Sequence, residues 1–256
     1  MIGGNEADAY GGGVPASSES ALELDHVLIV DNRARSFGGG VEVSSTSTVS
    51  LSYTVVAGNE STLDGAGIST RSDGVAVAIE HSVVVGNAVC DLSEGKAAGV
   101  ALIDGYDGAV SHVVVSENVG GPGVGSDAST MVAVEVSDAW GNEGGDYVGM
   151  TDPAGTGGNL SVDPSFLDTS ARFALDPDLH LGLSSPVVDA GNPAQFDPDG
   201  SRADIGPYGG EGADDREPDG DGFPAWWQPG PYTSDLTTQG WDRDDLDAGM
   251  RPGSGC

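Results

Sequence analysis

The chain of 256 residues is strongly acidic, with a formal net charge of −32 at pH 7 from nine basic and 41 acidic residues. This charge argues against nucleic acid as a partner, and against tight binding of polyanions unless divalent cations bridge them. No apolar run reaches the length of a membrane span, and no basic segment followed by an apolar stretch opens the chain. Aromatic residues make up only 6% of the chain while 42 residues are glycine, so we expect a narrow core of small aliphatic side chains.

An asparagine marks a repeat in the first part of the chain. It recurs at intervals of 27, 27, 28, 31 and 24 residues, at Asn5, Asn32, Asn59, Asn87, Asn118 and Asn142. Eight residues before each of the last five stand Leu24, Leu51, Ile79, Val110 and Val134. A period in the twenties with apolar alternation inside it is typical of a solenoid. We therefore predict an all-β fold, a right-handed parallel β-helix of about five coils with about three short strands each, over residues 1–150.

Each repeat has a rigid part and a variable part. A hydrophobic residue after one or more glycines occurs once per coil, at Val14, Val41, Ile68, Val100 and Val124. From this residue to the next asparagine there are 18 or 19 residues, whereas from the asparagine to the next such residue there are 6 to 13. One corner therefore tolerates insertions. Met1 stands just ahead of "IGGN", which reads as the end of a coil, so we expect that an upstream part is missing.

The asparagines are predicted to have a structural role at a corner of the coil. Asparagine tolerates left-handed backbone angles, its amide can hydrogen-bond to neighbouring backbone, and stacked amides can form a ladder. The alternative is a ligand-binding role. We favour the structural one because the residue recurs in every coil. The predicted ladder consists of Asn32, Asn59, Asn87, Asn118 and Asn142.

A second column brings three of the four histidines to one corner. Six residues before the repeat asparagine stand His26, Tyr53, His81, His112 and Val136. We favour a stacked aromatic ladder on the bend. In the alternative, His81 and His112 on adjacent coils share a transition metal. That alternative lacks a third ligand on the second coil, where Tyr53 is a poor substitute.

The stretch "GGGVEVSSTSTVSLSYTVVAGN" (residues 38–59) and its neighbours carry a family resemblance. They resemble the generic repeats of the pectin-lyase-like parallel β-helix family, over roughly residues 1–150. The resemblance implies the fold rather than a function, because enzymes, adhesins and passive surface proteins share that scaffold.

Residues 151–210 break the repeat. The elements "DPSF" (163–166), "SPVVDAG" (185–191) and "DPDGSRADIG" (197–206) resemble the C-terminal end module of bacterial surface β-helix proteins. This resemblance implies a module that closes the open end of the stack, whose last coil otherwise presents unpaired backbone groups. Arg202 stands among Asp189, Asp197, Asp199 and Asp204. A structural ion pair is favoured there over a catalytic carboxylate pair, because no matched base or nucleophile stands nearby.

Residues 211–256 form an acidic tail that resembles a metal-binding repeat of secreted bacterial proteins, D-x-DGDG followed by DCDD-x-D. The resemblance implies a Ca²⁺ site, because hard cations prefer carboxylate oxygens; its ligands would be Asp215, Glu217, Asp219, Asp221, Asp242, Asp244, Asp245 and Asp247. Arg243 stands where the pattern has cysteine, which leaves Cys256 without its local partner. A disulfide between Cys90 and Cys256 is open, as is a solvated acidic linker in place of the calcium site.

Three functions are compatible with these features. We favour a non-catalytic protein, secreted or on the cell surface, with a structural or adhesive role, stabilised by calcium and directed at carbohydrate or cell-surface components. The alternatives are a polysaccharide lyase or glycoside hydrolase, and a carbohydrate-binding module that uses Trp226 and Trp227 as stacking platforms. A lyase needs a poised base, but the basic residues form no cluster. A hydrolase needs converging carboxylates, and Asp25, Glu80 and Asp107 do not share one column.

Overall fold

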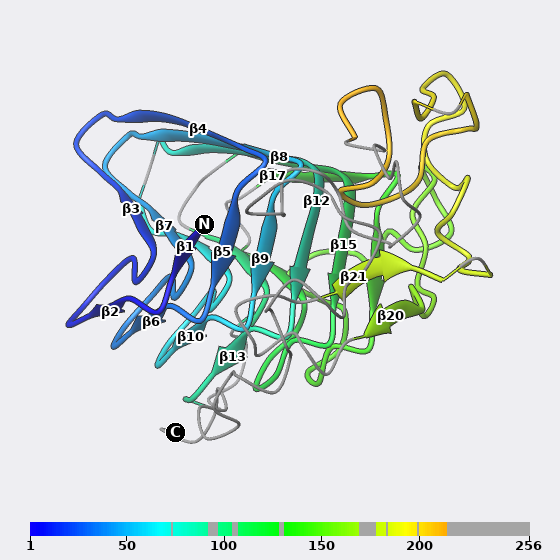
Figure 1. The fold of residues 1–256 in the computed structure, drawn as a ribbon. Coiled ribbons are helices and arrows are strands. Elements are labelled where there is room, and N and C mark those ends of the chain that lie inside the picture. The colour runs from blue at the N-terminus through cyan, green and yellow to red at the C-terminus, as the bar shows by residue number, and fades with distance from the viewer. Residues whose placement is uncertain are drawn as a thin grey trace, which may run out of the picture.

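The computed structural model describes residues 1–72, 74–91, 97–103, 107–127, 131–168, 178–182, 184–198 and 200–213. These residues form a parallel β-solenoid of about five turns, which confirms the predicted fold class. The coils stack from the N-terminal β1 at one end toward β15 and the β20–β21 pair at the other (Figure 1). Within the described ranges no helix has the length and hydropathy that a membrane crossing requires.

Three parallel sheets run along the stack, and the first two coils have four strands each rather than the expected three, because two of them belong to sheet 1. Sheet 1 contains β1 (Ile2–Gly3), β4 (Ala21–Asp25), β5 (Leu28–Val30), β8 (Thr48–Ser52), β9 (Val55–Ala57), β12 (Ala76–Val85), β15 (Asp107–Ser116), β17 (Met131–Glu135) and β18 (Asp138–Trp140). Sheet 2 contains β2 (Glu6–Ala7), β6 (Arg33–Ala34), β10 (Glu60–Ser61) and β13 (Ala88–Val89). Sheet 3 contains β3 (Val14–Ala16), β7 (Val41–Val43), β11 (Ile68–Thr70), β14 (Val100–Leu102), β16 (Val124–Ser126) and β19 (Tyr147–Val148).

Equivalent residues of successive coils pair in register. The first half of sheet 1 consists of β4, β8, β17 and the N-terminal parts of β12 and β15; the remaining strands and parts form its second half. In the first half, the backbone of each coil pairs with the next at equivalent residues, which are Leu24, Leu51, Ile79, Val110 and Val134. These side chains point into one buried core together with those of sheet 3. Because side chains alternate between the two faces of a strand, a slip of one residue would expose the whole row. The apolar periodicity therefore sets the register.

Packing explains the glycine that precedes every sheet 3 strand except β19. A Cβ on Gly67 would lie 2.5 Å from the carbonyl oxygen of Gly99 in the next coil and 3.1 Å from Nδ2 of Asn87. The equivalent Cβ on Gly40 would lie 2.6 Å from the carbonyl oxygen of Gly67 and 3.1 Å from Nδ2 of Asn59. Any side chain here would push the coils apart and displace the asparagine column. The recurring glycine thus leaves the space that the asparagine side chain and the next coil occupy.

The corners differ from our expectation in one detail. The left-handed angle lies on the residue before the asparagine, for example Asp31 (φ 54°), Gly58 (φ 61°) and Glu117 (φ 53°). The asparagine itself turns its side chain into the stack. The bend between the two halves of sheet 1 is also left-handed, at the aromatic column: His26, Tyr53, His81, His112 and Val136 have φ between 42° and 56°.

The chain continues the stack beyond residue 150. The amide of Leu160 donates to the carbonyl oxygen of Ser137 at 2.8 Å, and the amide of Val162 donates to Oδ1 of Asp138 at 3.0 Å. Asp138 is fully buried, and burial, only partly offset by this hydrogen bond, raises its pKa to about 7. A further partial coil therefore joins the repeats to the segment that follows.

That segment covers the side of the stack. Its residues Leu179, Val187 and Ile205 pack against the outer face of the second half of sheet 1. The sheet residues in this layer include Val55, Val83 and Val114, all fully buried. Strands β20 (Phe166–Asp168) and β21 (Asp178–Leu181) form an antiparallel pair at the end of the stack opposite β1 (Figure 1). The outward-facing residues of this half of the sheet are therefore apolar and buried.

Candidate functional site

The aromatic column forms a continuous stack across four coils. Ring centroids are 4.9 Å apart between His26 and Tyr53, 5.2 Å between Tyr53 and His81, and 4.5 Å between His81 and His112. Successive ring planes differ by 7° to 19°. The left-handed bend directs each ring outward from the sheet, and the pairing of the coils places the rings above one another. This is the stacked aromatic ladder that the sequence predicts.

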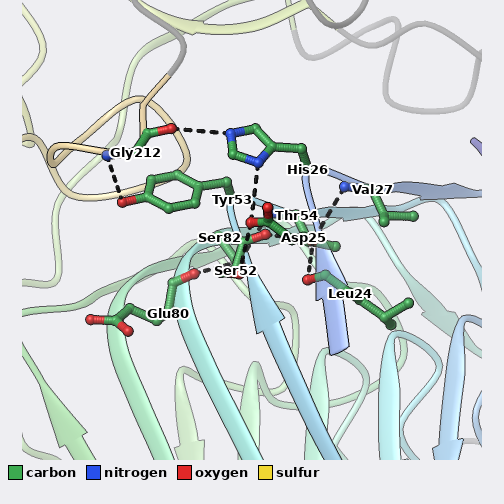
Figure 2. Close-up of polar contacts among 10 residues, drawn as sticks. All are labelled: Leu24, Asp25, His26, Val27, Ser52, Tyr53, Thr54, Glu80, Ser82 and Gly212. Carbon is green, nitrogen blue, oxygen red and sulfur yellow. Dashed lines mark hydrogen bonds and ion pairs between the residues drawn. The ribbon is translucent and has the colours of Figure 1, made fainter. Parts of the chain in front are cut away.

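A polar row lies beside the ladder, formed by the residue before each ring. Nδ1 of His26 lies 3.1 Å from Oδ1 of Asp25, which also accepts a hydrogen bond from Oγ of Ser52 at 2.9 Å (Figure 2). Nδ1 of His112 lies 2.8 Å from Oγ of Ser111. The full polar row is Asp25, Ser52, Glu80, Ser111 and Glu135.

Residues 206–213, which we call the strap, cross the outer edge of the ladder. The amide of Gly212 donates to the hydroxyl of Tyr53 at 3.1 Å, and its carbonyl oxygen lies 3.1 Å from Nε2 of His26 (Figure 2). A Cβ on Gly210 would lie 2.8 Å from Cε1 of His81. The strap therefore lies so close to the ring that only glycine fits at position 210. The amide of Gly206 donates to the carbonyl oxygen of His112 at 3.0 Å. The strap therefore fixes the ring edges that face away from the core.

Burial controls the protonation of the ladder. It lowers the pKa of His81 to about 4, with a further contribution from the neighbouring His112. Burial also lowers the pKa of His112, against an opposing effect of Glu80, and raises that of Tyr53. Both histidines are therefore neutral at pH 7, the state in which an imidazole nitrogen can accept a hydrogen bond or bind a metal.

An open groove lies next to the polar row, on the outer face of the first half of sheet 1. Its volume is about 440 Å³. Strands β4, β8, β12 and β15 line it, mostly with small residues: Ala21, Leu22, Glu23, Thr48, Val49, Ser50, Ala76, Val77, Ala78, Gly108 and Ala109. Glu80 stands two residues beyond Ala78 on the same strand and is exposed. The groove thus crosses four coils along the stacking direction.

The predicted asparagine column forms an unbroken chain of side-chain hydrogen bonds. Nδ2 of each asparagine donates to Oδ1 of the next, at 2.8 to 3.0 Å, from Asn5 to Asn142. In the middle of the column, Oδ1 of Asn59 also accepts from the amide of Asn32 at 3.0 Å, and Nδ2 of Asn59 donates to the carbonyl oxygen of Ile29 at 3.0 Å. Asn59 is fully buried. Its amide atoms are therefore occupied within the stack.

A second polar ladder was not predicted from the sequence. It follows directly after the aromatic column, where Oγ1 of Thr54 accepts from the amide of Val27 at 3.4 Å and Oγ of Ser82 accepts from the amide of Thr54 at 3.1 Å. Farther along, Ser137 and Asn159 continue the pattern. The signal was present, because hydroxyl residues recur five residues before the repeat asparagine at Thr54, Ser82 and Ser137.

The other predicted sites have different outcomes. The tail carboxylates, Trp226, Trp227 and Cys256 lie outside the described residues. Cys90 is disulfide-bonded. The guanidinium of Arg202 donates to the backbone carbonyls of Ala190 and Gly191. Asp199, one of the acidic residues expected to pair with Arg202, lies outside the described residues.

No protein-family profile matches this chain, and neither does any curated protein or solved structure. The parallel β-solenoid therefore rests on the strand pairing, and the function has to be argued from the geometry of the groove and the ladder.

Proposed function

We propose that the protein is a non-catalytic, secreted or surface-displayed β-helix with an adhesive role, whose groove on sheet 1 holds an extended, uncharged carbohydrate. The groove itself carries the proposal, because it is open, crosses four coils and is lined by small side chains. A flat groove of this kind accommodates a chain that runs along the stack. Adhesins are among the proteins that share the pectin-lyase-like scaffold, which the repeats resemble.

The chemistry beside the groove favours a neutral glycan. The polar row offers carboxylate and hydroxyl oxygens at Asp25, Ser52, Glu80 and Ser111, one on each coil. Stacked at about 4.8 Å per coil, these groups can bind a series of sugar hydroxyls. The net charge of −32 opposes an anionic polymer. The ladder rings lie under the strap, so recognition depends on hydrogen bonds rather than on ring stacking.

The same geometry disfavours a retaining glycoside hydrolase. Asp25 and Glu80 share the polar row two coils apart, which corresponds to about 10 Å between their backbones. Retaining hydrolases place their carboxyl groups about 5 Å apart. Asp25 also contacts both His26 and Ser52. The spacing of Asp25 and Glu80 therefore does not match the carboxylate pair of a retaining enzyme.

Calcium stabilisation and an extracellular location are part of the proposal on sequence grounds. The Asp-rich tail motif supports calcium, and its resemblance to secreted bacterial proteins supports the location. Divalent cations would also moderate the mutual repulsion of so many carboxylates.

Filling the groove is expected to abolish binding. Ala78 is exposed in the middle of the groove, so the Ala78→Trp variant should bind neutral polysaccharides such as mannan or xylan about tenfold or more weakly than the wild type. Ala194→Trp makes the same change at an exposed position of the end segment and should leave binding unchanged. Binding is measured by affinity electrophoresis and calorimetry, with thermal melting to show that both variants are folded.

Three results would contradict the proposal. The Ala78→Trp variant could bind as tightly as the wild type, the wild type could prefer polygalacturonate without calcium, or it could bind none of the polysaccharides. Release of reducing ends or unsaturated products during the assay would identify an enzyme instead.

A further inference from the structure

We propose that Glu80, His81 and His112 form a binding site for a transition-metal ion of the Zn²⁺ or Cu²⁺ type, at the edge of the groove. One potential ligand atom from each of these three residues lies within 4.8 Å of the other two. Two imidazoles and a carboxylate are the ligand set of many catalytic zinc sites, where water or another ligand takes the fourth position. The site shares Glu80 with the polar row beside the groove, and its test needs no carbohydrate.

The strongest indication is an unpartnered nitrogen of His81. The residue is only 3% exposed, yet its Nδ1 has no hydrogen-bond partner within the described part of the chain. Buried polar atoms are almost always paired, so such an atom calls for a ligand. The strap lies against the other side of the ring, where a Cβ on Gly210 would be 3.0 Å from Nε2. Nδ1 is therefore the atom that can bind a metal.

His112 can supply the second nitrogen. Its Nε2 accepts a hydrogen bond from the amide of Asn192 at 3.2 Å, which places its proton on Nδ1, toward Ser111. Metal binding at Nδ1 would move this proton to Nε2, and the amide of Asn192 would lose its acceptor. No net proton is released from this ring. Metal binding is thus linked to the hydrogen bond between His112 of the ladder and Asn192 of the segment that follows the repeats.

A small tilt of the rings would bring the two nitrogens to the separation that one ion requires. Nitrogen ligands at about 2.0 to 2.1 Å from a tetrahedral Zn²⁺ lie about 3.4 Å apart, and the potential ligand atoms here lie within 4.8 Å of one another. His112 can tilt because it is the last ring of the stack and is followed by Val136 on the next coil. Glu80 is exposed, so its carboxylate can turn to the ion and provides the entry path.

The histidines fit this role electrostatically. Both have lowered pKa values because of burial, so no proton has to be removed before a metal binds at neutral pH. The acidic chain also raises the local concentration of cations.

The test uses the full chain with excess Ca²⁺, so that the carboxylates proposed as calcium ligands in the tail are saturated. Zn²⁺ affinity is measured by calorimetry, and the Cu²⁺ complex by electron paramagnetic resonance, which counts coordinating imidazole nitrogens. The wild type should bind one ion with two such nitrogens. His81→Phe keeps a ring in the stack and should bind about tenfold or more weakly, with one nitrogen lost. Glu80→Gln, at an exposed position, should weaken binding while both nitrogens remain.

His26→Phe is the matched control, because His26 belongs to the same stack but lies beyond Tyr53, and it should bind as the wild type does. Amide exchange at Asn192 should become faster when Zn²⁺ is added to the wild type and remain unchanged in His81→Phe. The proposal is overturned if His81→Phe or Glu80→Gln binds like the wild type, or if His26→Phe weakens binding equally. A Cu²⁺ spectrum without imidazole nitrogens, or no Zn²⁺ binding at micromolar concentrations, would also overturn it.

Discussion

The Asn59→Ala variant is expected to lose about 3 kcal/mol of unfolding free energy. Asn59 is fully buried in the middle of the asparagine column and makes hydrogen bonds to the coils on both sides. Alanine removes the acceptor of the Asn32 amide, and a buried donor without a partner is costly. It also leaves a small cavity between three coils. The loss is measured by urea unfolding.

Asn5 provides a control of the same chemistry. It stands at the exposed first position of the column, so Asn5→Ala should cost less than about 0.5 kcal/mol. Equal effects of the two substitutions would show that the column does not stabilise the stack. An Asn59→Ala variant with unchanged stability but weaker polysaccharide binding would assign the column to ligand binding instead.

The Leu51→Ala variant is expected to lose about 4 kcal/mol, within the range for large-to-small changes in a packed core. Leu51 is 1% exposed and lies in the main core, paired with Leu24 and Ile79 on the neighbouring coils. The backbone on both sides is held by strand pairing, so the stack cannot collapse into the cavity. Thermal and urea unfolding measure the loss.

Leu22→Ala makes the same change at a partly exposed position one coil earlier. Less apolar surface returns to water there, so the loss should be about 1 kcal/mol. If Leu51→Ala costs no more than Leu22→Ala, Leu51 does not lie in a tightly packed core.

The apolar rows of the first half of the coil were predictable because local periodicity reports them directly. Leu51 and Ile79 recur at the same distance from the asparagine, and they pair as that spacing implies. The second half of sheet 1 was harder to interpret. Val83 and Val85 face outward but are buried, because a segment about 100 residues later packs over them. Alternation within a strand indicates two faces, but it does not show what covers the outer one.

The candidate site was predictable only in part. The spacing brought the histidines to one corner, and the stack follows from the register. The strap was not foreseeable, because the contacts of Gly212 with Tyr53 and of Asn192 with His112 join residues 159 and 80 positions apart. Such contacts depend on the path of the end segment, which no repeat encodes.

Vertical alignment of the coils is best measured with pairs of nitroxide labels attached to non-natural amino acids, so that the native disulfide stays intact. Glu23, Ala78, Ala109 and Ala133 are exposed and occupy one row of sheet 1. One label stays at Glu23, and Ala78, Ala109 and Ala133 lie two, three and four coils away. At about 4.8 Å per coil, we expect backbone separations of about 10, 14 and 19 Å. Dipolar electron paramagnetic resonance reports these distances. Separations that fail to lengthen in equal steps would contradict a stack of parallel coils.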